Sequence, residues 1–301
     1  MAAAPLAGDV QSMLPAAQCQ RLMANEMLVV APDHGLIWCP NAKVGTTTWY
    51  EILRRKLMPQ TRSMPRCFPS ACPATPVAGA AEGTTSSAAQ GTPASAAAAA
   101  AGASYPLALP KRMLAAERVR LCDRRRFVSF TFIRNPWDRL ASAYLSKIDR
   151  GAKVRDKQAR HVQDQIRALF GLRSGAHITF GHFVRWVVQQ NASTMNPHWR
   201  PHSLRCDTLY TPYEFIGRYE TLQEDILHVL GMLGWSPSLV PAAHYSSVAQ
   251  RWSAASRLAS NRTERMLRLY QTPQLVELVA RKYRDDIVPF GYTFPGRKPD
   301  V

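Results

Sequence analysis

The chain has 301 residues, of which 46% are hydrophobic, so it is long enough for one large domain or two small ones with an ample core. Its formal net charge of +17 predicts anionic partners: nucleic acid, a phosphorylated cofactor or an acidic polysaccharide. No run of 18 apolar residues occurs, so the sequence predicts no membrane-spanning helix.

The N-terminal residues 1–25 form a poorly defined segment. Residues 1–13 lack the basic start and apolar core of a signal peptide, so we expect either an unconventional route or a sequence without its natural N-terminus. A single domain is predicted over 26–295. It is interrupted at about 59–109 by a stretch rich in Ala, Pro, Gly, Ser and Thr, which predicts a disordered insertion.

Strands and helices are predicted to alternate outside the insertion. The apolar segments 27–30 and 36–39 flank the turn sequence Pro32-Asp33-His34-Gly35, which predicts a β-hairpin. Residues 127–133 are aromatic and β-branched, as in a central strand, and Pro136 is suited to begin a helix ending at 147. Further helices are predicted over 47–56, 158–170, 180–190, 263–270 and 272–284.

The C-terminal half supplies one more strand and helix. Residues 215–218 are strand-like, and Thr221 with Glu224 has the signature of a capping box for a helix that ends at 233. This alternation predicts an α/β fold, with a sheet flanked by helices.

A loop with the chemistry of a phosphate cradle follows the strand at 36–39. Helix-start N–H groups bind anions, Gly45 allows close backbone approach, and Lys43 adds a charge. An ordinary capped turn is the alternative, because the order of residues is not that of a Walker A loop. Hydroxyl donors come from Thr46, Thr47 and Thr48.

A second candidate site begins where the strand at 127–133 ends. Arg134 follows this strand, and ligands of open α/β sheets bind at the carboxyl ends of strands. Ser142 lies two turns along the next helix, where its hydroxyl and Arg134 could grip a phosphate. The alternative is a salt bridge that merely holds the strand–helix junction.

These motifs together resemble those of the sulfotransferases. The KxGTTT loop and the RNPWDRLxSAY segment are similar to the two motifs with which that family binds 3′-phosphoadenosine 5′-phosphosulfate (PAPS). Residues 196–201 (NPHWRP), 213–225 and 290–292 resemble segments of Golgi carbohydrate sulfotransferases, including the chondroitin and dermatan 4-O-sulfotransferases. The resemblance covers about residues 26–292, and implies a P-loop-like sulfotransferase fold with a central parallel sheet.

The resemblance implies a carbohydrate sulfotransferase that moves a sulfuryl group from PAPS to a glycan hydroxyl by in-line displacement, without a metal. It assigns the 3′-phosphate to Arg134 and Ser142. Lys43 would neutralise the leaving oxygen, and His198 would accept the acceptor's proton. Glu51 is an alternative base, and a structural role beside Trp199 is the alternative for His198. The 5′-phosphosulfate is assigned to Lys43, Gly45, Thr46, Thr47 and Thr48.

The resemblance also implies a glycan or proteoglycan acceptor, anionic in keeping with the charge, and the Golgi lumen or membrane. Membrane association would require an N-terminal anchor that this sequence lacks. Sequons at Asn191 and Asn261 fit a secretory glycoprotein. Relatives often carry two cysteines after the HWRP word and an Asn where Thr48 stands, whereas only Cys206 follows here, so that family disulfide is not expected.

Two other classes compete for the same features. A P-loop kinase would share the cradle, but it should show a Walker lysine and Mg²⁺ ligands, and neither pattern is found. A nucleic-acid-binding protein would explain the net charge, but it should show a binding module or basic tail. The basic stretch 111–126 fits a solvated helix face or a surface that steers an anionic glycan. No metal-ligand spacing is evident among the six cysteines and eight histidines.

Overall fold

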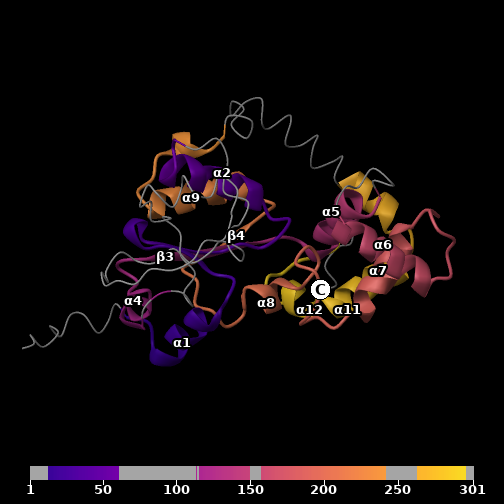
Figure 1. Ribbon diagram of the computed structural model, residues 1–301, viewed down its shortest axis with the longest axis horizontal. Coiled ribbons are helices and arrows are strands. Elements are labelled where there is room, and N and C mark those ends of the chain that lie inside the picture. The colour runs from indigo at the N-terminus through magenta and orange to yellow at the C-terminus, as the bar shows by residue number, and fades with distance from the viewer. Residues whose placement is uncertain (1–12, 61–112, 114, 150–156, 242–262, 296–301) are drawn as a thin grey trace, which may run out of the picture.

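The computed structural model describes residues 13–60, 113, 115–149, 157–241 and 263–295 (Figure 1). One four-stranded sheet has the order β1-β2-β3-β4. The predicted hairpin is confirmed, since β1 pairs antiparallel with β2, and β2, β3 and β4 are mutually parallel. The sheet is therefore mixed but mostly parallel. Its strands are β1 (Val29–Ala31), β2 (Leu36–Cys39), β3 (Val128–Ile133) and β4 (Phe215–Arg218).

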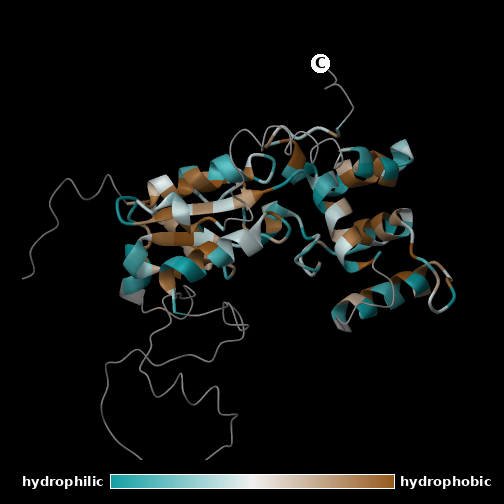
Figure 2. Cartoon of the chain, turned by 90° about the horizontal axis from the view of Figure 1, so that it is seen from above, coloured by the Kyte–Doolittle hydropathy of each residue, from teal (hydrophilic) through white to brown (hydrophobic). Residues whose placement is uncertain are grey.

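Helices cover both faces of this sheet, as the α/β pattern predicts (Figure 1). On one face α2 (Thr46–Leu57) and α9 (Leu222–Met232) pack on aromatic strand residues. Trp49 of α2 contacts Phe130 and Phe132 of β3, with ring centroids 4.6 and 5.7 Å away. On the other face lie α1 (Ala16–Ala24) and α4 (Ala115–Arg120). The strands are mainly hydrophobic in Figure 2, because both faces are buried.

A group of helices packs beside the sheet around a second apolar core (Figure 1). Trp137 is buried in it, and its indole N–H donates to the Val276 carbonyl at 3.0 Å. Trp137 is therefore a core residue of this group. The group comprises α5 (Pro136–Lys147), α6 (Lys157–Leu169), α7 (Phe180–Gln189), α11 (Pro273–Lys282), α12 (Arg284–Ile287) and the helical residues 263–269.

The structure differs from the sequence-based predictions in one helix cap and in two additional helices. The capping box is wrong, because the Thr221 hydroxyl donates to Asp225 at 2.8 Å rather than capping a backbone N–H. Helices α1 and α8 (His202–Arg205) were not predicted, since one is short and the other spans a single turn. The predicted insertion lies outside the described residues, apart from 59 and 60. No helix of the described part is long and apolar enough to cross a membrane.

Two disulfides join distant parts of the chain. Cys19 of α1 is bonded to Cys122, which fastens that helix beneath the sheet. Cys206, for which the sequence predicted no partner, is bonded to Cys39 at the end of β2. The second disulfide therefore ties the start of the predicted phosphate loop to the residue that follows α8.

Candidate active site

A cavity of about 610 Å³ opens at the carboxyl ends of β2 and β3. Both predicted motifs border it, because each follows one of these neighbouring parallel strands. The residues that the resemblance assigns to opposite ends of PAPS thus line the same cavity. The predicted residues in its lining are Lys43, Gly45, Thr46, Thr47, Thr48, Arg134, Ser142 and His198.

The loop after β2 has a backbone conformation suited to close approach by a ligand. Gly45 has φ +82°, and a Cβ atom there would lie 2.6 Å from the Leu222 side chain, so only glycine fits. Lys43 also has a positive φ, of 70°, which is uncommon for a residue with a side chain. The loop is fixed by buried Asn41, whose amide donates to the Phe132 carbonyl at 3.0 Å. It is therefore formed in advance.

The three threonines at the start of α2 differ in what they can donate. The Thr46 hydroxyl donates to the Asn41 carbonyl, so Thr46 can offer a ligand its backbone N–H but not its hydroxyl proton. Thr47, in the first turn of α2, is exposed. Thr48 also lines the cavity, and its backbone N–H donates to the Gly45 carbonyl at 2.9 Å.

Arg134 forms the salt bridge that was the alternative role for its position, and it also borders the cavity. Its Nε and Nη2 donate to Asp138, each at 2.8 Å, and its Nη1 donates to the Lys43 carbonyl at 2.8 Å. The guanidinium also lies over the Tyr219 ring, 4.0 Å from its centroid. Because a guanidinium has five N–H donors, two remain for an anion in the cavity. The salt bridge thus holds Arg134 in place beside Ser142.

Arg139 joins the two sides of the cavity from beneath. It is buried, and its three nitrogens donate to the carbonyls of Ala42, Arg200 and Pro197 at 3.1, 2.7 and 3.0 Å. Burial lowers its pKa to about 10, which still leaves it charged at neutral pH. One guanidinium therefore sets the distance between the Lys43 loop and the His198 loop.

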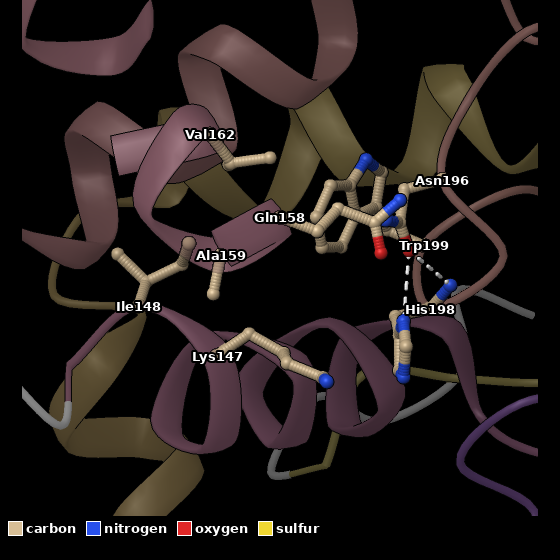
Figure 3. A pocket seen from close by; sticks show the side chains of 8 residues that line it. All are labelled: Lys147, Ile148, Gln158, Ala159, Val162, Asn196, His198 and Trp199. Atoms are coloured by element: carbon tan, nitrogen blue, oxygen red, sulfur yellow. Dashed lines mark hydrogen bonds between the residues drawn. The ribbon is translucent and has the colours of Figure 1, made fainter. Parts of the chain in front are cut away.

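His198 is oriented by its neighbour Asn196 (Figure 3). The Asn196 side-chain oxygen accepts from the His198 backbone N–H at 3.0 Å and from ring Nδ1 at 2.8 Å. With Nδ1 as the donor, Nε2 carries the lone pair. Burial lowers the pKa of His198 to about 4, and the positive charges of Lys147 and Lys43 contribute. The ring is therefore neutral at pH 7 and can accept a proton.

A small pocket of about 10 Å³ lies behind this histidine, roughly the space of one water molecule. Figure 3 shows the Lys147 side chain extending toward the His198 ring across it. Trp199 borders the pocket but is buried, and its indole N–H donates to Gln190 at 3.2 Å. Trp199 is therefore a core residue.

The alternative base Glu51 does not fit the site. Its carboxylate accepts from Arg54 at 2.7 and 2.8 Å and from Arg55 at 2.9 Å, all within α2. These hydrogen bonds lower its pKa to about 2, which makes it a weak proton acceptor. Glu51 is also absent from the described lining of the cavity.

The lining also contains an arginine and two tyrosines that were not assigned from the sequence. Arg205 donates from Nε to the Pro40 carbonyl at 3.1 Å, Tyr50 lies on α2, and Tyr219 stacks on Arg134. Next to Tyr219, Glu220 has a structural contact, because its carboxylate accepts from the Asn135 N–H at 2.8 Å. No cluster of metal-ligating side chains occurs among the described residues.

The fold and cavity together define an α/β protein with a cavity at the carboxyl edge of its sheet, lined by Lys43, Arg134 and Arg205. The model of the sulfotransferase family matches residues 26–293, which is most of the chain. The chain belongs to the sulfotransferase family.

Similar proteins of known activity are carbohydrate sulfotransferases. Carbohydrate sulfotransferase 11 of Rattus norvegicus is 26% identical over 182 residues, covering 56% of this chain and 48% of the relative. Carbohydrate sulfotransferase 14 of Homo sapiens is 33% identical over 111 residues, covering 35% and 28%. The matched region thus spans about half or less of these relatives. No solved structure matches the chain.

Replacing the buried guanidinium tests its role in joining the loops. We expect Arg139→Met to lower the free energy of unfolding by about 3 kcal/mol, because three carbonyls lose their donors. Denaturant unfolding measures this value. The matched control is Arg185→Met, an exposed position of α7, which should change stability by no more than about 0.5 kcal/mol. Equal stability of both variants would contradict the role of Arg139.

Proposed function

We propose that this chain transfers a sulfuryl group from PAPS to a hydroxyl of a glycan. The observation that carries the proposal is the single cavity bordered by the Lys43 loop on one side and by Arg134 with Ser142 on the other. Family membership and the carbohydrate sulfotransferase relatives support it. The P-loop-like character of the fold is part of the proposal, as is one sulfotransferase domain over 26–295 with α1 packed against it.

The cavity has what a doubly phosphorylated nucleotide needs. The Lys43 loop and the start of α2 would hold the 5′-phosphosulfate, with Gly45 leaving room for the anion. Arg134 would bind the 3′-phosphate with its two remaining N–H donors, together with the Ser142 hydroxyl. Arg205 adds a further cation to the lining.

The reaction is an in-line displacement at sulfur. A bond forms between the acceptor oxygen and sulfur as the bond from sulfur to the 5′-phosphate oxygen breaks. Nε2 of His198 takes the acceptor proton, and the electron pair of the broken bond leaves on the phosphate of 3′-phosphoadenosine 5′-phosphate (PAP). Lys43 stabilises that leaving oxygen, so catalysis consists mainly of positioning and electrostatics.

The acceptor and compartment follow from the relatives and from the charge. A glycan or proteoglycan acceptor is proposed, anionic because the chain carries a net charge of +17. Residence in the Golgi lumen is proposed on the relatives' family, with membrane association depending on an anchor outside this sequence. Two disulfides support an oxidising compartment, and the sequon residue Asn191 is exposed.

A binding comparison tests the donor. PAP should bind in isothermal titration calorimetry more tightly than ATP. Preference for ATP would favour a kinase, and salt-sensitive binding of duplex DNA would favour a nucleic-acid-binding protein.

A variant of the loop lysine tests the contact to the leaving group. Lys43→Ala should lower kcat about 10²–10³-fold with folding retained, since it removes one contact to the leaving oxygen. Lys56→Ala, at an exposed lysine on the helix α2 that follows this loop, is the control and should keep wild-type turnover. Near wild-type turnover of Lys43→Ala would reject its role.

The pH dependence tests His198. The neutral ring is the active base, and its pKa in the folded protein is lowered to about 4, so kcat/KM should stay level from pH 8 to about 5.5. Below that it should fall with an apparent pKa near 4 rather than at the ordinary 6.5. His198→Gln should remove this step and lower kcat. Circular dichroism at each pH separates titration from unfolding. A step near 6.5, or one that persists in His198→Gln, would contradict the assignment.

A further inference from the structure

A second cavity, of about 340 Å³, adjoins the donor cavity at Arg205, which lines both. We call it the arginine cavity. Its volume lies within the range of roughly 300–1,000 Å³ that small-ligand sites occupy. The arginine cavity is lined by Arg21, Ala24, Asn25, Glu26, Met27, Arg200, Leu204, Arg205 and Asp207.

Two of its three guanidiniums lack a carboxylate partner. Arg21 pairs with Asp207 at 3.8 Å. By contrast, Arg200 donates to the Leu204 carbonyl at 3.2 Å, and Arg205 donates to the Pro40 carbonyl. Among the described residues neither forms an ion pair. The buried Nε of Arg200 has no hydrogen-bond partner there at all.

These two cations are held in place without being neutralised. The Arg200 carbonyl is anchored by Arg139, and Arg205 is fixed at Pro40 and lies in α8, next to the disulfide at Cys206. Burial lowers the pKa of Arg205, with the charge of Arg200 contributing, so the pair is partly desolvated and mutually repulsive. An oxyanion between them would relieve both costs through charge-assisted hydrogen bonds.

The nearby surface suits a sugar ring. Leu204 is 48% exposed and Tyr210 is 60% exposed, so both side chains present surface to the solvent. The Arg21 guanidinium lies 4.8 Å from the centroid of the Tyr210 ring, so this aromatic ring stands beside the arginine cavity. A ring with an apolar face and a polar tip can contact the C–H face of a sugar.

We propose that the arginine cavity binds an anionic sugar unit of the acceptor, close to the unit whose hydroxyl is sulfated. The inference rests on the proposed function and deepens it, because it locates the part of the site that selects an acidic glycan. Arg200 and Arg205 grip the carboxylate or sulfate oxygens, which are the shared chemistry of uronate and sulfated units. The path from His198 to Arg200 is short in the chain, since both residues belong to the NPHWRP word.

The test uses the full chain, saturating PAPS and three oligosaccharides of equal length. One contains uronate units, one has these carboxyl groups reduced to alcohols, and one is carboxyl-reduced but carries sulfate esters. Arg200→Gln should raise the KM of the anionic acceptors about tenfold, leaving kcat and the KM of the neutral acceptor unchanged. Arg200→Lys keeps the charge but loses the planar guanidinium with its paired N–H donors, so it should give a smaller rise in KM. Arg185→Gln removes an exposed charge elsewhere and should change nothing.

The outcomes separate this proposal from the proposed function. An increase confined to the uronate or to the sulfated acceptor supports the proposal and identifies the oxyanion. An equal rise for charged and neutral acceptors, or no rise at all, overturns it while PAP affinity stays intact. Loss of PAP binding or of all sulfation by the wild-type protein would instead reject the proposed function. Thermal unfolding of Arg200→Gln and Arg200→Lys confirms that KM is compared between folded proteins.

Discussion

The geometry of the site depends on one buried guanidinium. Arg139 lies under the cavity and donates to carbonyls on both of its sides, at Ala42 in the loop after β2 and at Pro197 and Arg200 in the loop before α8. Neither loop belongs to the sheet, so their separation depends on these hydrogen bonds together with the Cys39–Cys206 disulfide and the Arg205–Pro40 hydrogen bond. A buried charge is costly to desolvate, and three carbonyl partners offset that cost here. Among these links, Arg139 is the one that reaches both the residue before Lys43 and the residue before His198.

In the proposed reaction, the same positive field serves binding and proton transfer. Lys43, Arg134 and Arg205 line the cavity, where they favour anions. Lys43 and Arg205 are also among the charges that lower the pKa of His198, after burial. A histidine amid cations stays unprotonated, which is the form that can accept a proton. Consequently, the positive charge that would attract a phosphorylated donor also keeps the His198 ring unprotonated.

Much of the site could be predicted because its residues are close in sequence. The loop at 43–48 and the pair Arg134 and Ser142 follow strands whose apolar patterns are clear, and parallel pairing brings the two loops together. Arg205 escaped prediction because it lies in the single-turn helix α8, which has no periodic pattern. The Cys39–Cys206 disulfide joins residues 167 positions apart, a pairing that spacing does not reveal. The capping box failed because Asp225 competes for the Thr221 hydroxyl.

That disulfide has a practical consequence for making the protein. It covalently joins the end of β2 to the residue after α8. These two segments are synthesised far apart in time. In a reducing cytosol this bond does not persist. Recombinant material should therefore come from a secretory or periplasmic host, or be refolded with a thiol–disulfide couple, before its kinetics are measured.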